Sequence, residues 1–305
     1  MLQEIEETIM NSIGTPKSEV TIDTDLVLDL LQKQHPDLSN LPIQLHDSGW
    51  DNVMFRLGHK LSVRLPRREI AASLNEQTWL PQIANNLTIP VPTPYRIGEP
   101  TSQYPWRWSV LPWLTGLAAD QEKPNLNQAR QLALFLRSLH LIAPANAPLN
   151  SVRGVPLKKR ATAIEQRMQR LENKTDLITK TIKSIWQRAL NTPIDVGAKW
   201  LHGDLHPGNI LVKKGMIVGI IDWGDITSGD IATDLACIWM LFNNRRARQE
   251  AIAQYSMSEQ TLQRAKGWAI YFAITLLEVG LIDNPRQAIT GEQTLRCVAE
   301  DETTV

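Results

Sequence analysis

Three oxygen-bearing side chains lie close together along the chain between residues 200 and 225. Asp204 and Asn209 precede the apolar run 210–212, and Asp222 directly follows the apolar run 216–221. Carboxylate and amide oxygens are ligands that Mg²⁺ accepts in proteins, and a carboxylate beside them can orient a hydroxyl group. The pattern indicates chemistry between a magnesium-bound phosphate and a hydroxyl acceptor.

The elements that must position these side chains are two short strands. The runs 210–212 and 216–221 are separated by a Lys-Lys-Gly sequence typical of a turn, so they predict an antiparallel hairpin. In such a pair the start of the first strand lies beside the end of the second. Asn209 and Asp222 should therefore meet at one end of the hairpin, with Asp204 nearby on the preceding loop.

The spacing of these residues resembles that of a known family. Asp204 and Asn209 have the D-x-x-x-x-N separation of the protein-kinase catalytic loop, and Asp222 stands where the metal-binding Asp of kinases follows. The chain has His-Gly-Asp at 202–204 and Asp-Trp-Gly at 222–224 in place of H-R-D and D-F-G. This combination resembles the aminoglycoside phosphotransferase family, and residues 229–236 are similar to that family's G-D-P-x-x-D-L-A.

The resemblance implies an α+β, protein-kinase-like fold with two lobes. Residues 1–111 would form the nucleotide-binding lobe, a helix with an antiparallel sheet. Residues 112–116 would form the hinge, and 117–305 a helical lobe with the catalytic loop and the substrate site. The activity implied is transfer of the γ-phosphoryl group of ATP or GTP to a hydroxyl group of a small molecule.

The resemblance also assigns roles within the catalytic loop. Asp204 would be the catalytic base, and Asn209 and Asp222 would hold Mg²⁺ on the nucleotide. His202 and His206 are expected to be structural, because Asp204 already fills the role of base and Mg²⁺ prefers oxygen ligands. In the segment 229–236, Asp230 is expected to cap the following helix. Asp234 is expected to brace the catalytic loop rather than to touch the substrate, which is the alternative.

In the first lobe, a helix is predicted over 24–34 and strands over 41–45, 53–57 and 61–65. The loop 47–52 between the first two strands would lie over the triphosphate. The hydroxyl of Ser48 and the backbone N–H groups near Gly49 would face phosphate oxygens there.

Arg64 stands where kinases carry the lysine that holds the phosphates. Arginine is a permanent cation that grips phosphate or carboxylate oxygens in pairs, so it can serve in this place. A helix is predicted over 69–84, and Glu76 is the residue expected to orient Arg64, with Glu69 as the competing candidate. The segment Arg-Leu-Pro-Arg at 64–67 is similar to that of the macrolide kinases in this family.

A strand at the edge of the sheet is predicted over 106–111, and in the kinase-like fold the hinge after it faces the purine. Leu111 and Trp113 are therefore nucleotide-binding candidates by position. The remaining apolar periodicity predicts helices over the following ranges: 125–142, 157–190, 233–243, 246–255, 258–282 and 285–298.

Composition narrows the class of protein. The 32 Lys and Arg residues balance the 32 Asp and Glu residues, so net charge does not favour a nucleic-acid or membrane partner. The two cysteines, of which Cys237 is predicted to be a core residue, exclude a disulfide scaffold or a Cys-x-x-Cys zinc site. The acidic N-terminus predicts no signal peptide, and no membrane-spanning helix is expected. A cytoplasmic enzyme is predicted.

The sequence does not identify the acceptor molecule. The last helices mix acidic and basic residues, which does not indicate a site for a polycation, and macrolides, sugars, amino alcohols or other metabolites are all compatible with the sequence. The biological role, antibiotic resistance or metabolism, is equally open. Two alternative functions are a non-catalytic nucleotide-binding scaffold, suggested by Arg64, and a protein kinase, disfavoured by the absence of H-R-D and A-P-E.

Overall fold

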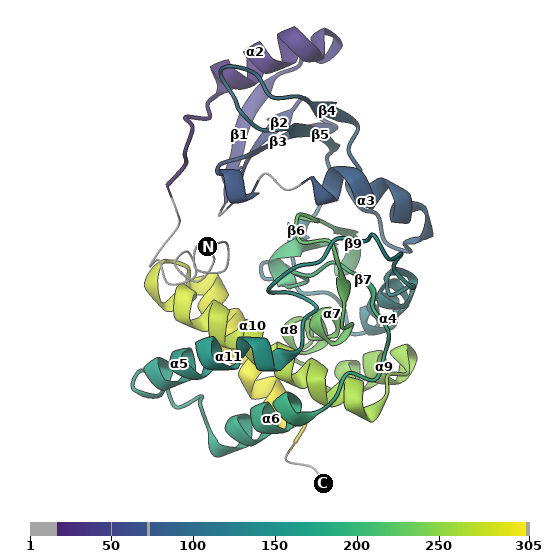
Figure 1. Cartoon of the computed structure of the whole chain (residues 1–305), viewed down its shortest axis with the longest axis vertical. Helices are drawn as coiled ribbons and strands as arrows, with labels where there is room; N and C mark the ends of the chain where they lie inside the picture. Colours follow the sequence, from purple (N-terminus) through teal and green to yellow (C-terminus); the bar gives the residue numbers. More distant parts are fainter. Residues whose placement is uncertain (1–16, 50, 72–73, 303–305) are drawn as a thin grey trace. The chain divides into compact units, whose positions relative to one another are not determined.

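The computed structural model describes residues 17–49, 51–71 and 74–302. Its chain forms two compact units: Met1–Asn85 with Pro90–Thr115, here unit 1, and Asn86–Ile89 with Gly116–Val305, here unit 2 (Figure 1). The N-terminal segment that predicts no signal peptide lies outside the described residues. So do residue 50 of the predicted phosphate loop and residues 72–73 of the predicted helix 69–84.

Unit 1 is built on an antiparallel sheet with the strand order β1-β2-β3-β5-β4. Its strands are β1 Ile43–Ser48, β2 Asn52–Leu57, β3 Leu61–Pro66, β4 Arg96–Gly98 and β5 Trp108–Pro112. The prediction that β5 is an edge strand was wrong, because β4 pairs with its outer side. β4 is three residues long and ends on a glycine, so its sequence is typical of a turn rather than a strand.

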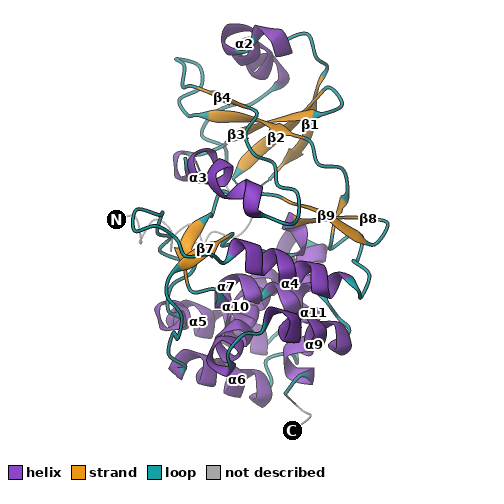
Figure 2. Ribbon diagram, turned by 90° about the vertical axis from the view of Figure 1, so that its right-hand side faces the viewer, coloured by secondary structure: helices purple, strands orange, loops and turns teal. Residues whose placement is uncertain are grey.

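The predicted helix 24–34 is confirmed as α2, Thr24–Gln34. Asp23 caps it, because its Oδ1 accepts the N–H of Leu26 at 2.9 Å. The helix lies against one face of the sheet (Figure 2) and buries Val27, Leu30 and Leu31 there. On β2 every second side chain is buried, as the period of two in a strand requires, and these side chains meet α2 in one core.

The helix predicted over 69–84 is shorter than expected. A 3-10 turn, η2 Glu69–Ala71, comes first, and the α-helix α3 covers only Asn75–Ile83. Two further 3-10 turns, η1 Pro36–Leu38 and η3 Ala84–Asn86, complete the regular structure before β4.

The predicted hairpin forms in unit 2. β8 Ile210–Lys213 pairs antiparallel with β9 Met216–Ile220, with Ile210 opposite Ile220, and β6 Leu117–Ala118 adds to the other side of β8. Lys214 and Gly215 have φ values of 53° and 74°, which is typical of a tight hairpin turn. A separate pair, β7 Lys199–Leu201 with β10 Thr227–Gly229, flanks the loop that carries Asp204.

The rest of unit 2 is helical. Its helices are α4 Gln128–Leu139, η4 Leu157–Arg160, α5 Ala161–Glu172, α6 Lys180–Asn191, η5 Pro207–Asn209, α7 Ala232–Leu235, α8 Cys237–Leu241, α9 Arg245–Tyr255, α10 Glu259–Asp283 and α11 Pro285–Glu300. The predicted helices 157–190 and 233–243 are each divided. The first divides because Thr179 caps α6, its Oγ1 accepting the N–H of Ile182 at 3.2 Å.

The helix α10 is the centre of unit 2 and packs against α5, α6, α7 and α11 (Figure 1). The sequence predicted no helix capable of spanning a membrane, yet α10 meets that criterion by length and composition. Its most apolar 18-residue window has a mean hydropathy of 1.5, and 67% of that window is buried inside the protein. Its apolar character therefore matches that of a central core helix, which is apolar on all sides because neighbouring helices surround it.

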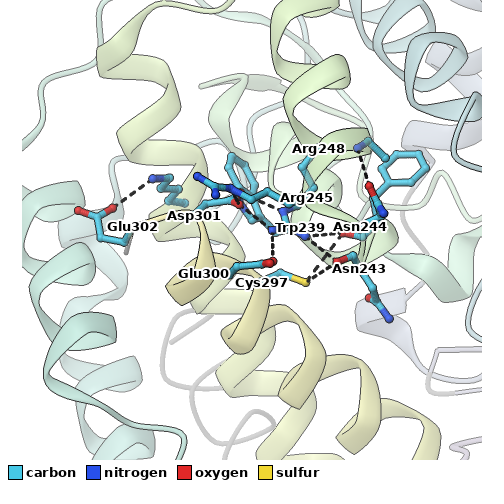
Figure 3. A network of polar contacts seen from close by, with 12 residues as sticks. Trp239, Asn243, Asn244, Arg245, Arg248, Cys297, Glu300, Asp301 and Glu302 are labelled. Carbon is cyan, nitrogen blue, oxygen red and sulfur yellow. Dashed lines mark hydrogen bonds and ion pairs between the residues drawn. The ribbon is translucent and has the colours of Figure 1, made fainter. Parts of the chain in front are cut away.

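A buried arginine joins the ends of α8, α9 and α11 (Figure 3). Arg248 has no exposed surface and binds both carboxylate oxygens of Asp301, at 2.9 Å from Nε and 2.6 Å from Nη2. Its Nη1 also donates to the carbonyl oxygens of Phe242 and Asn243 at 3.1 and 2.9 Å. Trp239 donates its indole N–H to the same Asp301 carboxylate at 2.9 Å.

Both cysteines are buried and unpaired. Cys237 has no exposed surface, as predicted for a core residue, and Cys297 on α11 is 5% exposed. Burial raises the pKa of both thiols.

Candidate active site

A buried carboxylate holds the loop that follows β7. Asp234, with no exposed surface, accepts the backbone N–H of His202 at 2.7 Å and of Gly203 at 2.9 Å. Gly203 has a φ of +88°, and a Cβ at this position would lie 2.5 Å from the carbonyl oxygen of Asp225. The loop therefore needs glycine here. The predicted bracing role of Asp234 is confirmed.

The predicted capping role of Asp230 is also present. Its Oδ1 accepts the N–H of Ala232 at 3.2 Å, at the start of α7. The same carboxylate pairs with the buried guanidinium of Arg264, at 2.8 Å from Nε and 3.1 Å from Nη2. Both aspartates of the segment 229–236 thus hold the backbone around the catalytic loop.

Both ring nitrogens of His202 form hydrogen bonds with backbone groups. Nδ1 accepts the N–H of Asp204 at 3.2 Å, so Nε2 carries the proton and donates to the carbonyl oxygen of Ile221, 3.0 Å away. The buried ring lies against Trp223, with ring centroids 4.7 Å apart. His202 is therefore structural, as predicted.

The end of the hairpin brings the catalytic loop and the segment after β9 together. Asn209 accepts the N–H of Ile221 on its backbone oxygen at 2.9 Å, and its side-chain Nδ2 donates to the backbone oxygen of Asp204 at 2.9 Å. The same Nδ2 lies 3.5 Å from Oδ2 of Asp204. Asp222 is exposed and has a φ of 62°, a left-handed conformation that Asp tolerates better than most residues.

These residues fit a magnesium site completed by phosphates. Asn209 directs its amide nitrogen to Asp204, which leaves its amide oxygen for a cation, and Asp222 supplies an exposed carboxylate after β9. Within the described residues no group of three or more His, Cys, Asp or Glu side chains could hold a metal ion. Mg²⁺ is commonly bound in this manner, through one or two side chains and the phosphates of its nucleotide.

Two basic side chains lie beside the carboxylate of Asp204. Nη2 of Arg153 donates to Oδ1 at 2.8 Å, and Nε2 of His206 lies 3.5 Å from Oδ2. Burial alone raises the pKa of Asp204, but the charges of Arg153 and His206 outweigh it and hold that pKa well below its usual range. Burial alone lowers the pKa of His206, and Asp204 reverses this, so the pKa of His206 is raised. Asp204 is ionised at neutral pH, the state that a base requires.

In unit 1 the predicted ion pair is present. Arg64 on β3 donates from Nη1 to Oε2 of Glu76, which is buried at the start of α3. With its amide oxygen turned toward Arg64, Asn52 accepts from Nε at 3.2 Å and from Nη2 at 2.9 Å. The competing candidate Glu69 instead donates its backbone N–H to Glu19 at 3.1 Å. The guanidinium is thus fixed in orientation from two sides.

The structure also places the other unit 1 candidates. Ser48 is an exposed residue at the end of β1, and the N–H of Gly49 already donates to Asn52 at 3.0 Å. Leu111 is buried within β5. The backbone N–H of Trp113 donates to Lys60 at 2.7 Å. The Trp113 ring lies under the guanidinium of Arg56 at 4.0 Å and beside His46.

Comparison with known proteins decides the family. The sequence profile described as the phosphotransferase enzyme family matches residues 42–268. The chain belongs to this family. Two curated members that it resembles are the aminoglycoside 3'-phosphotransferases of Escherichia coli and Salmonella typhimurium, each 28% identical over 138 and 139 residues respectively. The matched stretch is 43% of this chain and 50% of each relative, so the chain spans about half the length of the curated relatives it matches.

Solved structures in the same family share the fold. The GDP complex of aminoglycoside 2'-phosphotransferase-IIIa superposes with a TM-score of 0.66 at 16% identity, covering 92% of this chain and 100% of that one. Macrolide 2'-phosphotransferase MphH from Brachybacterium faecium gives a TM-score of 0.57 at 19% identity, covering 90% and 97%. The predicted α+β, protein-kinase-like fold is confirmed, with a sheet-based unit and a helical unit.

Sequence reasoning missed two residues of this candidate site. Arg153 lies in the loop between α4 and η4 and binds Asp204, and Tyr271 on α10 accepts from Nη1 of Arg153 at 3.1 Å. The loop 140–156 has no apolar periodicity, and its arginine is 51 positions from its partner, so no spacing signal connects the two. His206, expected to be structural, also has its Nε2 3.5 Å from Oδ2 of Asp204.

Proposed function

We propose that this chain is a cytoplasmic small-molecule O-phosphotransferase that moves the γ-phosphoryl group of ATP or GTP to a hydroxyl group of its acceptor. The observation that carries the proposal is the meeting of Asp204 with Asn209 at the end of the β8–β9 hairpin, directly beside the segment that bears Asp222. Solved relatives include complexes with GDP, with ADP, and with streptomycin and ATP.

The roles follow from the chemistry of each side chain. Asp204 accepts the hydrogen of the acceptor hydroxyl and takes its proton as the phosphorus–oxygen bond forms. Asn209 and Asp222 hold Mg²⁺, which when bound neutralises charge on the phosphates. Arg64, oriented by Glu76 and Asn52, binds phosphate oxygens in unit 1. In this assignment unit 1 binds the nucleotide and unit 2 carries the catalytic loop and the acceptor.

A turnover screen tests the proposal. The protein is incubated with ATP or GTP and with aminoglycosides, macrolides, sugars, amino alcohols and hydroxy acids, and products are detected by mass spectrometry as the acceptor plus one phosphoryl group. Transfer to one class of hydroxyl compound is expected. Nucleotide binding without transfer to any acceptor would support the scaffold alternative, and transfer to a protein would support a protein kinase.

Replacing Arg64 tests the phosphate-binding role in unit 1. The Arg64→Met variant is expected to lose about 10–100-fold in kcat/KM for the nucleotide, because a charge-assisted hydrogen bond contributes about 1.5–3 kcal/mol. Arg64→Lys, which keeps a point charge, should lose less. Arg107→Met is the matched control, since Arg107 is a partly exposed unit 1 residue paired with Glu99. Equal kcat/KM values for wild type and Arg64→Met would contradict the role.

A further inference from the structure

The carboxylate proposed as the catalytic base is already bound by an arginine of the same unit. Nη2 of Arg153 donates to Oδ1 of Asp204 at 2.8 Å. Nε2 of His206 and Nδ2 of Asn209 each lie 3.5 Å from Oδ2. An acceptor hydroxyl that donates to Oδ1 therefore shares this oxygen with the guanidinium of Arg153. Because Arg153 is the closest of these groups, an acceptor bound at Oδ1 lies directly beside its guanidinium.

The guanidinium of Arg153 is held on an aromatic surface of α10. Nη1 donates to the hydroxyl of Tyr271 at 3.1 Å, and the guanidinium carbon lies 4.8 Å from the ring centroid of Phe272. Only 15% of the side chain is exposed. Its backbone is fixed by the next residue, Gly154, whose N–H donates to Thr233 at 3.2 Å. Arg153 is thus a largely buried cation that lies against α10 and beside the carboxylate of Asp204.

Charges of both signs lie around Arg153: the carboxylates of Asp204 and Asp225 act on it, and arginines of α5 and η4 lie near α10. On α10, Glu278 is neutralised by two arginines of α5, Arg167 at 2.9 Å and Arg170 at 2.5 Å. The guanidinium of Arg160 lies 5.9 Å from the ring centroid of Tyr271. A positive charge of a polycation such as an aminoglycoside would be repelled wherever it lies beside these arginines.

If the acceptor hydroxyl takes the place of Arg153 on Oδ1, this largely buried cation loses one carboxylate partner, while Asp225 still acts on it. Removing one partner from a buried ion pair is strongly unfavourable, because the remaining charge has lost its water and gained nothing in return. An anionic group on the acceptor would replace the lost partner, because the planar guanidinium binds both carboxylate and phosphate oxygens in a bidentate geometry.

We propose that the acceptor carries an anionic oxygen group, a carboxylate or a phosphate, near the hydroxyl that is phosphorylated, and that Arg153 moves from Asp204 to bind this group. The inference rests on the proposed phosphotransferase function and specifies its substrate class. Arg153 then has two successive partners: it pairs with Asp204 in the absence of the acceptor and frees Oδ1 for the hydroxyl when the acceptor's anion arrives. Tyr271 and Phe272 hold the guanidinium within reach of both.

Binding measured without nucleotide tests this independently of turnover. Isothermal titration calorimetry with gluconate, glycerol 3-phosphate, glucose and kanamycin compares a carboxylate, a phosphate, a neutral polyol and a polycation. Wild type should bind at least one anion more tightly than glucose and kanamycin, and the tighter anion identifies the group. Arg153→Gln should lose about 10–100-fold of that affinity, the loss expected when a charge-assisted hydrogen bond is removed, and leave glucose unchanged.

Further variants separate recognition from folding. Arg153→Lys should recover part of the anion affinity, and Tyr271→Phe, which removes the hydroxyl that holds Arg153, should lose a smaller part. Arg296→Gln, an exposed residue of α11 paired with Glu292, is the control and should bind as wild type does. Equal anion affinity in wild type and Arg153→Gln, or no preference of wild type for either anion over glucose, overturns the inference.

The two proposals fail in different ways. Phosphoryl transfer to a neutral or cationic acceptor, with no anion preference in calorimetry, would remove the substrate class and leave the phosphotransferase function standing. Arg153-dependent anion binding without transfer to any acceptor in the turnover screen would instead contradict the phosphotransferase function.

Discussion

Replacing Asp204 with asparagine should lower kcat for phosphoryl transfer by about 10²–10⁴-fold, the contribution typical of a positioned general base. Asparagine keeps the size of the side chain and one oxygen, but it cannot take the proton of the acceptor hydroxyl. It also removes the charge that Arg153 pairs with. Steady-state kinetics with the acceptor found in the turnover screen measures the effect, and calorimetry with the nucleotide should show little change in its affinity.

The control for this variant is another carboxylate of unit 2. Glu292→Gln changes a partly exposed residue of α11 that pairs with Arg296, and its kcat should equal that of wild type. If Asp204→Asn is folded, binds nucleotide and turns over at the wild-type rate, Asp204 is not the base.

Replacing Arg248 with methionine should lower the free energy of unfolding by about 3–5 kcal/mol, the cost of breaking a buried ion pair by removing one partner. Methionine fills a similar length but donates no hydrogen bond, so Asp301 loses its bidentate partner. The carbonyl oxygens of Phe242 and Asn243 at the end of α8 lose their donor as well. Urea unfolding followed by circular dichroism measures the loss as a lower midpoint.

Arg296→Met provides the comparison within the same helix. Arg296 is 60% exposed and pairs with Glu292 one turn away, a kind of contact that contributes about 0.3–0.5 kcal/mol. A midpoint for Arg248→Met that matches that of Arg296→Met would show that the buried network does not stabilise the helical unit.

The parts of the site that the sequence predicted are those fixed by neighbouring residues. Asp204 and Asn209 are five positions apart, and the hairpin between Asn209 and Asp222 is closed by its own turn. Strand alternation and a hydrogen-bonded turn determine such local geometry almost alone. The same holds for α2, whose cap and buried face lie within twelve residues of each other.

The parts that the sequence did not predict depend on distant partners. The sequence of a single strand does not determine which strands pair with it in the sheet. The three-residue β4 on the outer side of β5 was therefore missed. Arg153 lies in an irregular loop, and its role depends on Asp204, Tyr271 and Phe272, which are brought to it only by the packing of α10. The apolar length of α10 likewise reflects the helices that surround it.

The thiols of Cys237 and Cys297 are buried, so the native chain should react little with reagents that label cysteines. A single cysteine introduced at an exposed position, such as Gln32→Cys on α2 or Ser184→Cys on α6, would react with maleimide reagents far faster than Cys237 or Cys297. A pair of such cysteines carrying spin labels would report the separation of the sheet-based and helical units by pulsed electron resonance. Because Cys237 and Cys297 are buried, neither has to be replaced before labelling. The label-to-label distance could then be measured as nucleotide, and afterwards an anionic acceptor, is added.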